Sequence, residues 1–171
     1  MGADRAILVQ SDDKPDALTC ARVFLELVNR ESAELVILGK QAIDDDNSQT
    51  GQMLAALWDR PQATFASGVE LDGNTARVNR EVDAGIETVD VDLPAVLTVD
   101  LRLNDPRYVK LPDIMKAKKK PLDEISLGDM GIEAAPAIQE TTFEPPADRE
   151  KGVMVEDVQG LVGALKEKGL V

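Results

Sequence analysis

Two short apolar runs on either side of an amphipathic segment constrain the fold of this chain more than any other feature. Ala6–Val9 and Glu34–Gly39 are rich in Ile, Leu and Val and have the length of buried strands. Residues 15–28 between them place apolar side chains at helical spacing. The apolar face of this predicted helix consists of Leu18, Ala21, Leu25 and Val28. The order strand, helix, strand predicts a right-handed βαβ unit and a parallel sheet, so the fold class is α/β.

The middle of the chain changes to a different periodicity. A polar loop over residues 40–49 and a second predicted helix over 50–57 come first. After Pro61, residues 68–92 alternate with period two and are punctuated by turn residues, which predicts an antiparallel hairpin region with one wet face. The apolar run 94–99 is expected to return to the main sheet.

The last third of the chain carries weaker signals. Residues 104–152 contain six prolines and no long periodic run, so we expect an extended, irregular stretch. Residues 156–168 have the spacing of an amphipathic helix, acidic at its start and basic at its end, as the helix dipole favours. Leu161 and Leu165 on this helix need a surface on which to be buried.

Composition excludes several classes of function. The chain has one cysteine and no histidine, which removes a multi-cysteine zinc site, an imidazole-bound metal and a Ser-His-Asp triad. A net charge of −13 disfavours nucleic-acid binding, because phosphates are repelled over most of the surface. No run of 18 apolar residues occurs, so no membrane insertion is expected. We therefore expect a binding protein without catalytic residues or a bound metal, rather than an enzyme.

The loop over residues 39–51 has two interpretations. Ligands in α/β sheets bind beyond the carboxyl ends of strands, and the helix that begins near Thr50 offers backbone N–H groups that suit a phosphate. Asn47, Ser48 and Thr50 add side-chain donors. Alternatively, Asp44–Asp46 and Ser48 only cap the turn and the helix, with no ligand. The local chemistry leaves both interpretations open.

A basic segment stands out in this acidic chain. Lys110–Lys120 holds five lysines and one aspartate, with Ile114 and Met115 among them. By itself such a run is more simply a solvated loop without a partner. It also lacks the interleaved aromatic residues typical of single-strand nucleic-acid binding.

Several stretches together resemble the electron transfer flavoprotein beta subunit. Residues 38–53 are similar to the nucleotide loop of that family, and residues 100–120 are similar to its partner-recognition segment. Residues 61–67 and 80–88 also fit, in the same order. The similarity covers nearly the whole chain and fades after about Gly131.

The resemblance implies a Rossmann-like adenine-nucleotide-binding domain with a partial parallel sheet, an antiparallel hairpin region, an extended C-terminal arm and a terminal helix. It implies an electron carrier in a heterodimer, in which the alpha subunit holds most of the FAD and the beta subunit binds AMP structurally. Electrons would come from acyl-CoA and other dehydrogenases and pass to a quinone-linked oxidoreductase. The implied AMP-binding residues are Gly39, Lys40, Gln41, Ala42, Ile43, Asp44, Asp45, Asp46, Asn47, Ser48, Gln49 and Thr50.

The same resemblance gives the basic segment a role in docking to the dehydrogenases. Leu111 matches an apolar anchor, and Lys116 and Lys119 match lysines that are methylated in some members. The implied recognition residues are Leu111, Pro112, Ile114, Met115, Lys116 and Lys119. Residues 1–120 would then form the nucleotide-binding domain, with the recognition segment at 104–120, and residues 121–171 would form an arm and helix that contact the alpha subunit.

Two further expectations follow from the comparison with this family. Its beta subunits begin with an additional segment that supplies part of the AMP pocket, so we expect this chain to be truncated at its N-terminus relative to them and its AMP pocket to be incomplete. We expect a cytoplasmic location, or the mitochondrial matrix in a eukaryote. The alternative function is a stand-alone adenine-nucleotide-binding protein of the universal stress type, which would leave residues 110–120 unexplained.

Overall fold

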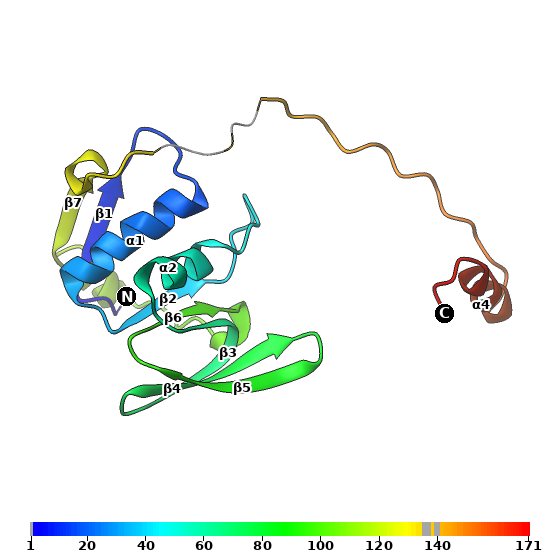
Figure 1. Ribbon diagram of the computed structural model, residues 1–171, viewed down its shortest axis with the longest axis horizontal. Coiled ribbons are helices and arrows are strands. Elements are labelled where there is room, and N and C mark those ends of the chain that lie inside the picture. The colour runs from blue at the N-terminus through cyan, green and yellow to red at the C-terminus, as the bar shows by residue number, and fades with distance from the viewer. Residues whose placement is uncertain (1, 135–137, 139–140) are drawn as a thin grey trace. The chain divides into compact units, whose positions relative to one another are not determined.

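A computed structural model describes residues 2–134, 138 and 141–171, and divides the chain into two compact units, Met1–Ile138 and Gln139–Val171. The first unit contains all the strands of the described residues and the helices α1 (Ala17–Glu31), α2 (Thr50–Trp58) and α3 (Leu111–Ala117) (Figure 1). The second unit contains α4 (Val158–Glu167).

The strands of the first unit form two sheets. Five strands pair in the order β2-β6-β3-β4-β5, and two further strands, β1 and β7, pair with each other. Pairing is parallel for β1 with β7 and for β6 with both β2 and β3, and antiparallel along β3, β4 and β5. The α/β fold with parallel strands and an antiparallel hairpin region is therefore confirmed. The strand bounds are β1 Ala6–Gln10, β2 Leu35–Gly39, β3 Gln62–Asp72, β4 Thr75–Val82, β5 Gly85–Asp92, β6 Ala95–Val99 and β7 Leu122–Ser126.

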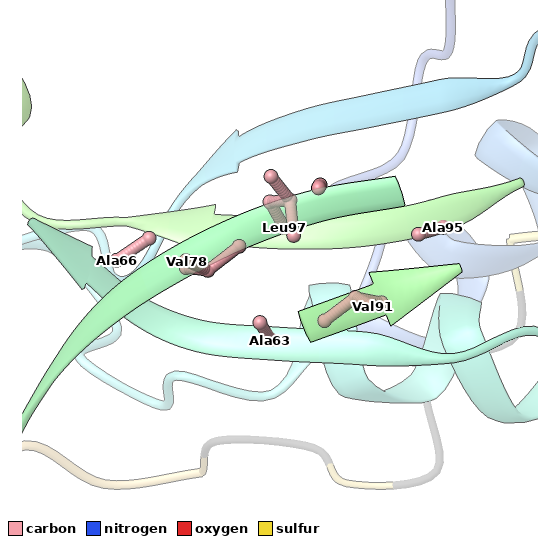
Figure 2. Packing of buried hydrophobic residues seen from close by; sticks show 7 residues of the cluster. Ala63, Ala66, Val78, Val91, Ala95 and Leu97 are labelled. Carbon is pink, nitrogen blue, oxygen red and sulfur yellow. The ribbon is translucent and has the colours of Figure 1, made fainter. Parts of the chain in front are cut away.

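The core has two clusters on opposite faces of β6. Val96 is fully buried with residues of α1 and α2, which cover one face of the sheet (Figure 1). Leu97, the next residue, points to the other face and packs with buried side chains of β3, β4 and β5 (Figure 2). This second cluster consists of Ala63, Ala66, Ala76, Val78, Val91, Ala95 and Leu97. Burial of β6 on both faces explains its continuous apolar sequence, which is typical of a central parallel strand.

Two predictions about sheet pairing and regularity are wrong in detail. The predicted βαβ unit implied that β1 and β2 share a sheet, but β1 pairs with β7 and β2 pairs with β6. The stretch 104–152 was predicted to be irregular, yet it contains α3 and β7. Ala6 of β1 pairs with Leu122 of β7, so this strand is specified by a contact distant in sequence rather than by a long local pattern.

The second unit agrees with the prediction of a terminal helix. Asp157 caps α4, because its side chain accepts a hydrogen bond from the Gly160 N–H at 2.7 Å. Residues 141–152 have no regular secondary structure, as predicted, while positions 135–137 and 139–140 of the predicted arm lie outside the described residues. Leu161 of α4 is 47% exposed. None of the described helices has the length and apolar character needed to cross a membrane.

Candidate functional site

A cavity of about 500 Å³ opens at the carboxyl end of β2. Its wall comes from the loop between β2 and α2, from the first turn of α2, and from α1 with the residues just before it. Every residue of the predicted loop 39–50 lines it except Ile43, whose side chain is fully exposed. The lining residues outside that prediction are Lys14, Pro15, Ala17, Cys20, Phe24, Leu38 and Gly51.

The first turn of α2 lines this cavity without a side-chain cap. In α1, the side chain of Asp16 accepts from the Thr19 N–H at 2.8 Å. By contrast, no side chain among the described residues caps α2, and its first residues line the cavity. An uncapped helix N-terminus carries free N–H groups and the positive end of the helix dipole, which together favour an anion.

Gly51 allows α2 to lie close to the sheet. A Cβ atom placed on Gly51 would lie 2.2 Å from Cγ2 of Thr98 on β6, far inside van der Waals contact. Because only glycine fits here, the first turn of α2 can approach the strand end. The loop before it also contains two residues in the left-handed region, Asp46 (φ 52°) and Ser48 (φ 51°).

The three consecutive aspartates are engaged within the loop and its surroundings. Asp44 accepts from the Asp45 N–H at 2.9 Å, and Asp45 forms an ion pair with Lys14 at 2.9 Å. Asp46 accepts from the side-chain amide of Gln41. These contacts give the acids a structural role in shaping the cavity wall.

A buried carboxylate joins this loop to the end of β6. The side chain of Asp100 is 2% exposed, pairs with Lys40, and accepts from Arg102 Nε at 2.8 Å and from the Arg102 N–H at 3.0 Å. The Arg102 guanidinium, the Lys40 ammonium and the Arg102 backbone N–H hold the pKa of Asp100 well below its usual range. Arg102 also pairs with Glu81 on β4.

Cys20 on α1 lies in the wall of the cavity. Burial, together with the nearby carboxylates of Asp16 and Asp45, raises the pKa of the Cys20 thiol. The thiol is therefore protonated at neutral pH and is a poor nucleophile.

The basic segment folds as a short helix with exposed apolar residues. Leu111 and Met115, one turn apart on α3, are 71% and 52% exposed, while Ile114 is half-buried. Pro112, Lys116 and Lys119 are exposed as well. The segment thus presents apolar and basic side chains together.

The α1 side of the cavity was not identified from the sequence. Lys14 and Cys20 are distant in sequence from the loop, and their place in the wall depends on the packing of α1 against α2. The Asp100–Lys40 pair was also missed, since it joins residues from two strand ends. Adjacent parallel strands bring their carboxyl ends together, so the sequence could have predicted that the residues just after two neighbouring strands lie close to each other.

Comparisons with known proteins identify the family of the chain. A family model described as "Electron transfer flavoprotein domain" matches residues 1–130. The chain is 49% identical to "Electron transfer flavoprotein subunit beta" of Bradyrhizobium diazoefficiens over 168 residues, which cover 98% of this chain and 68% of that protein.

Eukaryotic relatives match equally well. Identity is 49% to "Electron transfer flavoprotein subunit beta" of Homo sapiens and 50% to "Electron transfer flavoprotein subunit beta, mitochondrial" of Arabidopsis thaliana. Each of these alignments covers 100% of this chain and 69% of the relative. The chain therefore belongs to the electron transfer flavoprotein family and is an electron-transfer subunit of the beta type.

Proposed function

We propose that this chain pairs with an FAD-holding alpha subunit and binds AMP as a structural nucleotide in the cavity beside β2. The observation that carries the proposal is the uncapped first turn of α2 on the wall of a cavity of about 500 Å³. A cavity of this size falls within the range of small-molecule sites. The volume and the uncapped turn support a nucleotide whose phosphate lies at the start of α2.

The chain's own residues would each perform one task in that site. Backbone N–H groups at Ser48, Gln49 and Thr50 would hold the phosphate at the helix N-terminus. The loop residues from Gly39 to Asn47 would surround the nucleoside, with the aspartates keeping the loop in shape. The FAD, when bound in the alpha subunit, supplies the redox chemistry, and this chain contributes no catalytic side chain.

The second part of the proposal concerns the dehydrogenase partner. Residues 104–120 would dock on acyl-CoA dehydrogenases, with exposed Leu111 as the apolar anchor and the lysines steering the encounter. A small interface of this kind releases its partner quickly, as a shuttle requires. Electrons would then pass to a quinone-linked oxidoreductase.

The two-part organisation belongs to the same proposal. Residues 1–120 would form the nucleotide-binding domain, and 121–171 would contact the alpha subunit, although β7 within this stretch pairs with β1 of the first unit. Leu161 and Leu165 of α4 would find a surface on the alpha subunit. The location would be the cytoplasm, or the mitochondrial matrix in a eukaryote.

Native mass spectrometry tests the pairing and the nucleotide together. The chain is measured alone, and mixed with the matching alpha subunit in the presence of AMP. A one-to-one complex that carries FAD and AMP supports the proposal. Nucleotide retained by the chain alone, without pairing, would favour the stand-alone universal stress type instead.

A pair of threonine variants localises the nucleotide. Thr50→Val removes a hydroxyl at the start of α2 but keeps the side-chain shape, and we expect AMP affinity to fall about tenfold, since a hydrogen bond to a charged group is lost. Thr88→Val, on β5, is the control and leaves the affinity unchanged. Equal affinities for both variants would place AMP elsewhere.

A further inference from the structure

The carboxyl end of β6 holds both ends of the loop between β2 and α2. At the end of this loop, Gly51 lies so close to Thr98 that an added Cβ would be 2.2 Å from Cγ2. At its start, the backbone N–H of Lys40 donates to the Val99 carbonyl at 3.0 Å, and Lys40 Nζ pairs with Asp100. Three consecutive residues of one strand end therefore fix the loop that lines the cavity.

Asp100 is the charged member of this group, and its own position is fixed. Its side chain is 2% exposed, and while one oxygen pairs with Lys40, the other accepts from Arg102 Nε at 2.8 Å and from the Arg102 N–H at 3.0 Å. Its backbone N–H donates to the Ala66 carbonyl on β3 at 2.8 Å. Arg102 is held in turn by Glu81 on β4. Water screens a pair with one buried partner only weakly, so Asp100 is a firm anchor for the Lys40 ammonium.

Lys40 connects this anchor to the cavity wall. The described residues that line the cavity include Lys40 but not Asp100. The Nζ atom of Lys40 also lies 5.4 Å from the centre of the Phe65 ring, within reach of a cation–π interaction. The next residue, Gln41, donates from its side-chain amide to Asp46 farther along the loop. The order of the loop therefore builds on the position of Lys40, whose ammonium is already engaged.

We propose that Asp100 is a positioning residue of the nucleotide site. Acting through Lys40, it fixes the first residue of the loop against the end of β6, and so keeps the wall around the nucleoside in the shape that binds AMP. A loop that is ordered before binding loses less conformational entropy when the ligand enters, which raises the affinity. This inference rests on the proposed nucleotide-binding function.

Calorimetric titration of the full chain, in complex with its alpha subunit and stripped of nucleotide, tests this assignment. The ligands are AMP and adenosine, and the variants are Asp100→Asn, Lys40→Met and the double variant. We expect each single change to lower the affinity for AMP about tenfold, because the loop must then be ordered on binding. The double variant should bind no more weakly than either single variant, since both changes break the same contact. Adenosine should lose affinity by the same factor as AMP, because the affected wall surrounds the nucleoside.

Three outcomes would overturn the proposal. Additive losses in the double variant would mean that Asp100 and Lys40 act independently. A larger loss for AMP than for adenosine in Lys40→Met would mean that the ammonium contacts the phosphate directly. Unchanged affinities in both single variants, together with a lower free energy of unfolding, would mean that the pair only stabilises the fold.

The control is Asp90→Asn on β5, which breaks another aspartate–arginine pair, that with Arg77 at 2.9 Å and 3.2 Å. It leaves both affinities unchanged. Lys40→Met alone keeps the test decisive should Asp100→Asn fail to fold, because Arg102 still neutralises the buried carboxylate in that variant. An equal loss for AMP and adenosine is then expected, and unchanged affinity overturns the assignment. Failure of the proposed function itself looks different, because wild type then gives no heat with AMP.

Discussion

At the scale of single residues, Leu111 is the sharpest test of the docking proposal. Its side chain is 71% exposed on α3, so Leu111→Ala changes the free energy of unfolding by less than about 0.5 kcal/mol. An anchor that enters an apolar pocket contributes about 1.5–3 kcal/mol, which predicts at least a tenfold higher KM of the dehydrogenase for this carrier. Steady-state assays of reduction by the dehydrogenase measure this KM.

The matched control is Leu71→Ala, a second leucine that is 61% exposed but lies on β3. We expect this variant to keep the KM of wild type. A KM that rises equally for both variants would contradict an anchor at Leu111, because it would reflect a general loss of apolar surface.

Asp100 predicts a dependence of stability on pH. Arg102 and Lys40 hold its pKa below the usual value of 3.8, so the folded carboxylate releases its proton more readily than the unfolded one. Its contribution is therefore complete above about pH 4 and is lost as the pH falls through the folded-state pKa. The free energy of unfolding, from urea titrations at about pH 5 to 2.5, should fall more steeply in wild type than in Asp100→Asn. Parallel curves would contradict this assignment.

At the scale of elements, the close contact of α2 with β6 depends on the absence of a Cβ atom at Gly51. Gly51→Ala places a Cβ 2.2 Å from Cγ2 of Thr98, and we expect a destabilisation of about 1–3 kcal/mol from overpacking. Chemical denaturation measures it.

Thr98→Ser provides the compensating change for that clash. It removes Cγ2 but keeps the hydroxyl, which accepts from the Phe65 N–H at 3.4 Å. The double variant Gly51→Ala/Thr98→Ser should therefore be more stable than the sum of the two single changes predicts. Strict additivity would show that the steric contact is not the cause of the loss.

Elements were predictable where a local pattern defines them. The apolar runs of β1, β2 and β6 and the periodic face of α1 are visible in the sequence, and each is confirmed within a few residues. In β7, by contrast, Asp123 and Glu124 interrupt the apolar pattern of a strand of five residues. Its partner β1 is distant in sequence, at the start of the chain. No local signal specifies such a pairing.

The residues of the candidate site likewise divide into those that a local stretch of sequence indicates and those that only tertiary packing brings together. The loop from Gly39 to Thr50 is continuous in sequence, but its local chemistry left a ligand site and a simple cap equally open, and only the family resemblance gave it an AMP-binding role. The contributions of Cys20 on α1 and of the Asp100–Lys40 pair come from tertiary packing. Asp100 was placed only at the start of the stretch that resembles the partner-recognition segment, and its burial and its pairing with Lys40 and Arg102 are visible only in the folded chain.

At the scale of the whole molecule, the rate of encounter with a dehydrogenase should depend more on where the charges lie than on the net charge. The chain carries a net charge of −13, and the segment Lys110–Lys120, which contains α3, is one of the places where lysines gather. Lys116→Glu/Lys119→Glu and Arg22→Glu/Arg60→Glu shift the net charge equally, and all four side chains belong to exposed residues. If this segment steers the encounter, only the substitution of the lysine pair slows electron delivery and flattens its dependence on ionic strength. The reason is that steering acts through the local field, within about a Debye length.

Stopped-flow reduction by a dehydrogenase, at about 20 to 300 mM salt, measures both the rate and its dependence on ionic strength. Equal slowing by the two variants would mean that overall repulsion governs the encounter, and that the basic segment has no special place in it.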